Sequence, residues 1–181
     1  MARDRLITIA EEKKRMTPVV DSIDPPDTLL NPNSYEKGGW VLHMLRHRLG
    51  DSLFWKGIST YYTTYKNKNA SSEDFEKVIE TVSGQDLHVF FHQWLYTPGH
   101  PNIIISWKFD PDKKAAIISF TQTHDHLFDF PLEYSIDGTL YHIDIHDKTT
   151  QVDLPLPEPP KHLTPDPNVN LLASFELSKT L

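Results

Sequence analysis

The chain has 181 residues, no cysteine and a formal net charge of −7, with 18 basic and 25 acidic side chains. This length can bury a hydrophobic core and is typical of one or two domains. Because charges of both signs are mixed along the chain, the composition argues against nucleic acid or an anionic membrane as the main partner. The lack of cysteine excludes disulfides and thiolate metal sites and leaves the compartment open.

Neither a signal peptide nor a transmembrane segment is predicted. Charged residues interrupt each apolar stretch within residues 1–16, unlike the apolar core of a signal peptide. No stretch approaches the roughly 20 apolar residues that a membrane span requires. We therefore expect a soluble chain and assign no localisation to it.

The first 32 residues are predicted to form a helix and a connector. Residues 2–16 combine apolar positions with a charged end that is rich in lysine, which is typical of an amphipathic helix. Residues 17–32 contain four prolines and are expected to be extended.

Residues 33–50 are predicted to form a helix with both ends marked in the sequence. Asn33 is a favourable N-cap, and Glu36 three residues later could complete a capping box. Gly50 stands where a left-handed residue often ends a helix. Helical spacing places Gly38, Leu42, Leu45 and Leu49 on one face, which we expect to be buried.

Gly38 and Gly39 are unusual inside this helix. Each glycine costs about 1 kcal/mol relative to alanine, so we expect another backbone to approach the helix closely at this turn. Tyr35 lies one turn earlier. Periodicity alone favours a core position for this tyrosine, with its hydroxyl group hydrogen-bonded.

Three further helices are predicted before residue 97. The first begins at Asp51 or Ser52 and runs to residue 66, with an aromatic stripe that favours core packing over a ligand platform. The second begins at Ser71 or Ser72 and ends at Gly84. The third begins at Asp86 and ends in the proline- and glycine-containing stretch 97–101.

After residue 101 the apolar pattern changes from helical spacing to alternation. Strands are predicted over 103–109, 115–121, 130–136, 140–145, 152–156 and 171–177, with a proline-rich crossing at 155–167. The sequence Asp137-Gly138 is the strongest hairpin signal. This spacing is typical of a small antiparallel β-sandwich, so the whole chain is predicted to be an α+β protein.

The segment that begins at Tyr35 resembles the aminopeptidase N family of zinc metallopeptidases, which are gluzincins. The resemblance is carried by Tyr35-Glu36-Lys37-Gly38-Gly39, Val41-Leu42-x-Met44-Leu45, Gly50-Asp51-x-x-Phe54, Tyr61-Tyr62, Ser72-Glu73-Asp74-Phe75, Ser83-Gly84-x-Asp86-Leu87, Phe90-Phe91-x-x-Trp94-Leu95 and Pro98-Gly99-His100-Pro101. These motifs cover about 75 residues in the family's order.

The resemblance implies a function as well as a fold. Residues 1–100 would correspond to the helical C-terminal half of a thermolysin-like catalytic domain, and residues 101–181 to the β-sandwich domain that follows it. In the family, a zinc enzyme removes N-terminal residues from peptides. At the position of Tyr35, the family's tyrosine donates its hydroxyl proton to the oxyanion of the tetrahedral intermediate. A tyrosine side chain suits this role because its reference pKa of about 10 keeps it protonated at neutral pH.

The zinc-binding motif of the family, H-E-x-x-H, does not occur in this sequence. The pairs His43/His47 and His88/His92 have helical i, i+4 spacing but no intervening glutamate, so structural histidines are the favoured interpretation. His142, Asp144 and His146 alternate and could share one face of a strand, either as a metal triad or as exposed polar residues. The turn His124-Asp125-His126 is a weaker candidate. We expect no metal or other cofactor in this chain, with zinc held elsewhere in the intact enzyme.

Two functional hypotheses remain open from the sequence. In the first, the chain is the C-terminal portion of an aminopeptidase, inactive alone, that contacts either the zinc-bearing half or a second copy through its cut face. In the second, it is a non-catalytic interaction module on the same scaffold. The preferred N-terminal residue of the substrate and the origin of the chain as a split gene, truncation or expressed piece stay open, as does its oligomeric state.

Overall fold

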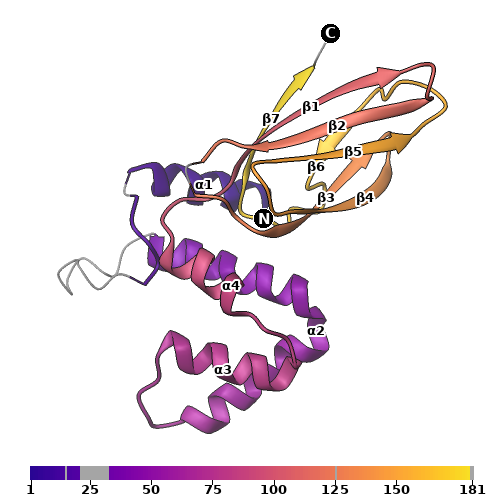
Figure 1. Cartoon of the computed structure of the whole chain (residues 1–181). Helices are drawn as coiled ribbons and strands as arrows, with labels where there is room; N and C mark the ends of the chain where they lie inside the picture. The colour runs from indigo at the N-terminus through magenta and orange to yellow at the C-terminus, as the bar shows by residue number, and fades with distance from the viewer. Residues whose placement is uncertain (15, 21–32, 125, 180–181) are drawn as a thin grey trace. The chain divides into compact units, whose positions relative to one another are not determined.

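The structure is a computed structural model that describes residues 1–14, 16–20, 33–124 and 126–179. The chain divides into two compact units, which are described separately. One is helical and contains residues 11–99. The other contains residues 100–181 together with residues 1–10, so helix α1 (Ala2–Lys14) contributes residues to both units. Figure 1 shows the elements of each unit.

The helical unit begins with a π-helical turn, η2 (Asn33–Lys37), which continues into α2 (Gly38–Tyr65). It then contains α3 (Ser72–Ser83), α4 (His88–Phe91) and a second π-helical turn, η3 (His92–Tyr96). In Figure 1 α2 is a long helix with a bend, and α3 returns alongside its second half. The predicted helices therefore exist, but two of them form one bent helix.

Most of the end signals in the sequence are confirmed. Ser71 and Asp74 form a complete capping box at the start of α3, and Gly84 ends it with a φ of 69°. Gly50 breaks α2 with a φ of 75° and a ψ of 162°, an extended left-handed conformation that glycine alone tolerates well. The predicted cap side chain of Asn33, residues 21–32 of the predicted connector, and Asp125 lie outside the described residues.

The predicted buried face of the helix at 33–50 is partly wrong. Leu45 and Leu49 are buried as expected, but Leu42 is 41% exposed. The core side of this helix is instead completed by three buried residues, Trp40, Val41 and Met44.

The expected close approach at Gly38 and Gly39 is also absent. A Cβ atom added to either glycine would meet no atom within 4 Å in the described part of the chain. The glycine that permits close packing is Gly57, where an added Cβ would lie 2.4 Å from Cδ1 of Ile79. Gly57 therefore brings α2 against α3, a role that the sequence pattern does not mark.

The core of the helical unit lies where α2, α3 and α4 meet. Ile79 from α3 and Leu87, Phe91 and Trp94 from the following segment are at most 1% exposed. The rings of Phe75 and Phe91 pack edge to face, with centroids 5.9 Å apart. Phe90 and Leu95 of the same segment are buried as well.

The other unit is a β-sandwich of two sheets (Figure 1). The first sheet has the order β5-β2-β1-β7, and the second has the order β4-β3-β6. The strands are β1 (Asn102–Asp110), β2 (Ala115–Gln122), β3 (Phe130–Ile136), β4 (Thr139–Ile145), β5 (Thr149–Pro155), β6 (Leu163–Pro165) and β7 (Ser174–Lys179).

Alternating side chains build the sandwich core. Ile103 and Ile105 from β1, Ile118 and Phe120 from β2, and Leu132 and Tyr134 from β3 are at most 2% exposed. The rings of Phe120 and Tyr134 connect the two sheets, with centroids 5.2 Å apart. The hairpin at Asp137-Gly138 is confirmed, because both residues have positive φ and Ile136 pairs with Thr139. The α+β fold class is thus confirmed.

Three details of the predicted sandwich are wrong. β7 pairs parallel to β1, so the sheets are not purely antiparallel. β6 lies inside the stretch read as a proline-rich crossing and pairs with β3. Leu171, Leu172 and Ala173 are buried but precede the last strand, which begins at Ser174. These three residues fill the core, which explains their strand-like apolar pattern.

Candidate active site around Tyr35

Tyr35 lies in the middle of the π-helical turn η2, and its side chain is 68% exposed. It is therefore not a core aromatic residue, which periodicity alone favoured. Isolated π-helical turns are rare in proteins and occur frequently at functional sites. The phenol group of Tyr35 is placed at the surface of the helical unit, where another molecule can reach it.

Lys37, the last residue of the same turn, is completely buried. Its ammonium nitrogen lies 3.0 Å from Oε1 of Glu12 on α1. It also donates hydrogen bonds to the carbonyl oxygens of Thr97, at 3.1 Å, and Gly99, at 2.7 Å. The turn that carries Tyr35 is thus fixed to two other segments of the helical unit through one side chain.

This buried ion pair changes the protonation of the lysine. Burial lowers the pKa of Lys37 below its ordinary value, and the neighbouring Glu12 carboxylate opposes that effect. Glu12 is also completely buried. A buried charge pair of this kind is strongly destabilised when one partner is removed.

Lys37 and Glu12 are not among the residues predicted from the sequence to form a site. A signal was available, because Lys37 lies four and seven residues before the buried Val41 and Met44. Glu12 lies three residues after the buried Ile9. Helical spacing thus places both charged residues on the same face as buried apolar residues. A charged side chain that is buried requires a partner.

An apolar groove lies beside the same helix. Its lining includes Gly38 and Leu42 from α2 and Phe75 from α3, and its volume is about 540 Å³. Tyr61 and Tyr62 from the second half of α2 also line it, and Tyr62 is 65% exposed. Gly38 and Leu42, which were expected to be buried, therefore face this groove.

Three histidines of the two helical pairs have contacts with neighbouring side chains. His88 lies 3.1 Å from Glu76, and its ring faces that of His92 at 6.1 Å between centroids. The ring of His43 packs edge to face on Trp40.

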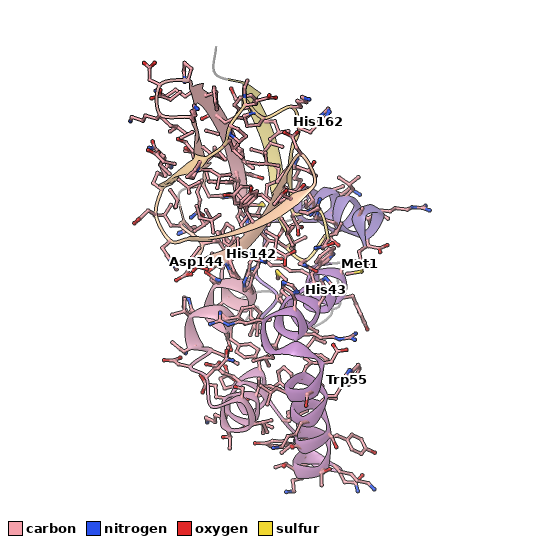
Figure 2. All side chains as sticks on the ribbon, turned by 90° about the vertical axis from the view of Figure 1, so that its right-hand side faces the viewer. Met1, His43, Trp55, His142, Asp144 and His162 are labelled. Atoms are coloured by element: carbon pink, nitrogen blue, oxygen red, sulfur yellow. The ribbon has the colours of Figure 1, made fainter. Side chains whose placement is uncertain are left out.

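The histidines of the sandwich unit that were metal candidates also contact other side chains. His142 and Asp144 lie on β4 and are exposed (Figure 2). His142 contacts Glu133 at 3.2 Å, whereas His146 contacts Asp129 at 2.9 Å. His124 is within hydrogen-bond distance of Asn102.

Across the described ranges, no group of three or more His, Cys, Asp or Glu side chains could hold a metal ion. Together with the lack of H-E-x-x-H, this means that the residues present do not fit a zinc site. Within the same ranges, no helix is both long and apolar enough to cross a bilayer.

Comparison with known proteins gives the family. Residues 3–94 match the model of the peptidase family M1 domain. The "Aminopeptidase N" of Lactococcus lactis subsp. lactis is 29% identical over 107 residues, which are 58% of this chain and 13% of that protein. "Probable aminopeptidase 2" of Sulfurisphaera tokodaii is 36% identical over 87 residues, or 48% of this chain and 11% of that protein.

The fold comparison extends over the β-sandwich as well. A crystal structure of Legionella pneumophila aminopeptidase A in complex with aspartic acid matches with a TM-score of 0.79 at 14% identity. The match covers 98% of this chain and 22% of that one. The helical unit and the sandwich thus have the fold of part of an aminopeptidase.

The chain belongs to peptidase family M1, the aminopeptidase N type of metallopeptidase. Its relatives are named as aminopeptidases, and it spans roughly an eighth of the length of the two described above.

Proposed function

We propose that this chain forms the C-terminal part of a zinc-dependent aminopeptidase, in which residues 1–100 belong to the catalytic domain and residues 101–181 to a β-sandwich domain. The observation that carries the proposal is Tyr35, which is exposed within the family's motif on a turn held by a buried lysine. The substrate would be a peptide with a free N-terminus.

In this proposal Tyr35 acts on the carbonyl oxygen of the scissile bond. When water adds to that carbonyl, negative charge develops on the oxygen. A phenol hydroxyl group can donate a hydrogen bond to this oxygen without losing its own proton. Such a donor is most effective when it is already in place, because the energy of moving it is then not added to the barrier. The exposure of Tyr35 allows the substrate to reach it.

The zinc ligands would come from polypeptide outside residues 1–181, supplied in cis or in trans. That polypeptide would pack on the surface around Tyr35. Two features of the same helix support this proposal. There is open space beside Gly38 and Gly39, and the adjacent groove presents apolar surface. Without such a partner, we expect the chain to retain no zinc and to hydrolyse no aminoacyl substrate.

An exchange between relatives tests the proposal. Residues 3–94 of this chain, which match the family model, would replace the corresponding part of the Lactococcus lactis aminopeptidase N, which keeps its own upstream part. We expect an active chimera. Within it, Tyr35→Phe should lower kcat by about 100- to 1,000-fold, the usual loss for one oxyanion donor, with a much smaller change in KM.

Tyr65→Phe is the matched control, since Tyr65 lies at the other end of α2 and is partly exposed. It should leave kcat unchanged. A folded chimera that binds zinc but hydrolyses nothing would contradict the proposal. So would near-normal turnover of its Tyr35→Phe variant.

A further inference from the structure

We propose that Lys37 is a positioning residue, which fixes the π-helical turn η2 and thereby the place of Tyr35. The inference rests on the proposed function of Tyr35 and extends it to a residue that contacts no substrate.

The geometry of the ammonium group supports this role. The ammonium group of Lys37 reaches three oxygen atoms at once. It donates hydrogen bonds to the carbonyl oxygens of Thr97 and Gly99, at 3.1 and 2.7 Å, and forms an ion pair with Oε1 of Glu12 at 3.0 Å. The two carbonyl groups belong to the segment directly after η3, whereas Glu12 belongs to α1. Because all three acceptors must be reached at once, the end of η2 has little freedom to shift.

The contacts at the end of η3 are themselves well defined. Thr97 is the C-cap residue of η3, and Gly99 lies two residues beyond it. Gly99 has a φ of 84°, a conformation that favours glycine. Lysine side chains commonly bind such terminal carbonyls. Lys37 thus connects the start of one helix to the end of another.

Stability alone does not explain a charge pair at this position. A buried ion pair is often no more stabilising than apolar residues of similar volume, because removing both charges from water costs several kcal/mol. An apolar side chain would fill the same space but could not bind two carbonyl groups. What lysine adds is a fixed position for the turn, and Tyr35 is only two residues away in that turn.

The tests use the full chain and two variants. Lys37→Met keeps an unbranched side chain, one atom shorter than lysine, and removes the hydrogen bonds of the ammonium group. Glu12→Leu/Lys37→Met removes both charges together. Amide hydrogen exchange would be followed by NMR in the turn at residues 35–37 and in α3. The control is Lys56→Met, which changes an exposed lysine on α2.

We expect exchange in the turn to become at least about tenfold faster in the Glu12→Leu/Lys37→Met variant, with less than about a twofold change in α3. The Lys56→Met control should leave both regions unchanged. Unchanged exchange in the turn would overturn the inference. Equal acceleration in the turn and in α3 would also overturn it, because the pair would then only stabilise the unit as a whole.

The second readout uses the active chimera. Glu12→Leu/Lys37→Met should lower kcat by about 10- to 100-fold at nearly constant KM, because a displacement of about 1 Å at a catalytic group can cost that much. A normal kcat would overturn the inference. If Tyr35→Phe leaves turnover normal, the proposed function fails, whereas the exchange experiment still decides whether Lys37 holds the turn.

Discussion

The helical unit and the sandwich bury their polar groups in different ways. In the sandwich, the side chain of the fully buried Gln122 binds the backbone N–H and C=O groups of Phe128, six residues away. Asp166 similarly accepts hydrogen bonds from the amides of Asn170 and Leu171, and it pairs with Arg5 as well.

In the helical unit, the buried Lys37 has partners that are distant in the sequence. Its two carbonyl acceptors are 60 and 62 residues away, and Glu12 is on the first helix. A polar contact between near neighbours shapes one loop, whereas a contact between distant segments fixes how they pack. The sandwich unit also contains one long-range charge pair, Arg5 with Asp166. What distinguishes the contacts of Lys37 is their place, two residues from Tyr35 in the same turn.

The largest effect on stability is expected from breaking the charge pair. Glu12→Leu leaves the Lys37 ammonium group buried without its counter-ion, so it should destabilise the helical unit by about 3–5 kcal/mol. The double variant Glu12→Leu/Lys37→Met should recover part of that loss, because it buries no charge but leaves the carbonyl groups of Thr97 and Gly99 without their lysine donor. Urea denaturation followed by circular dichroism measures both.

The loss in Glu12→Leu should also depend on pH. Because burial lowers the pKa of Lys37, the unfolded chain binds the proton more tightly, and stability rises with pH up to the ordinary lysine pKa of 10.5. The deficit relative to the unchanged chain should therefore shrink as the pH rises toward that value. A deficit below about 1 kcal/mol at neutral pH would mean that the pair is not desolvated as described.

A smaller effect is expected in the sandwich. Gln122→Leu preserves the size of the side chain but leaves the buried N–H and C=O groups of Phe128 without partners, which typically costs about 1–3 kcal/mol. No second substitution at a distant site should relieve it, in contrast to the charge pair. Thermal unfolding of the variant checks the size of the loss, and an unchanged melting temperature would refute the role given to Gln122.

The smallest effect concerns Tyr96 at the end of η3. Burial and a hydrogen bond to Glu73 raise the pKa of Tyr96 to about 12. Because the folded pKa is higher than the ordinary value of 10, this contribution is complete below pH 10 and is lost as the pH rises toward about 12. The loss of stability over this range should be smaller in Tyr96→Phe, as measured by urea midpoints at pH 9 and 11.5. Equal losses in both proteins would contradict the assignment.

Local patterns predicted much of this fold. The helix start at Ser71, the hairpin at Asp137-Gly138 and the alternation in β1 to β3 depend on near neighbours, and all are confirmed. The parallel pairing of β7 with β1 joins segments about 70 residues apart and leaves no local signature. The short strand β6 was hidden by the prolines around it, since a proline ring removes a backbone donor.

Only part of the candidate site could be predicted from the sequence. Tyr35 was identified by resemblance, because periodicity favoured a buried tyrosine and the side chain is exposed. Lys37 and Glu12 occupy positions with core spacing, so their burial could be suspected from the sequence. Their pairing could not, because it depends on how α1 packs against the start of α2 and the end of η3.

The central claim is that Lys37 acts through Tyr35, and a double-mutant cycle in the chimera tests it most directly. The kcat would be measured with Tyr35 or Phe at position 35, each combined with the original pair or with Glu12→Leu/Lys37→Met.

If Lys37 acts by positioning Tyr35, Glu12→Leu/Lys37→Met lowers kcat about 10- to 100-fold when Tyr35 is present. The same replacement has almost no effect on kcat in the Tyr35→Phe background. Equal losses in the two backgrounds would contradict the account, because Lys37 would then affect turnover independently of Tyr35.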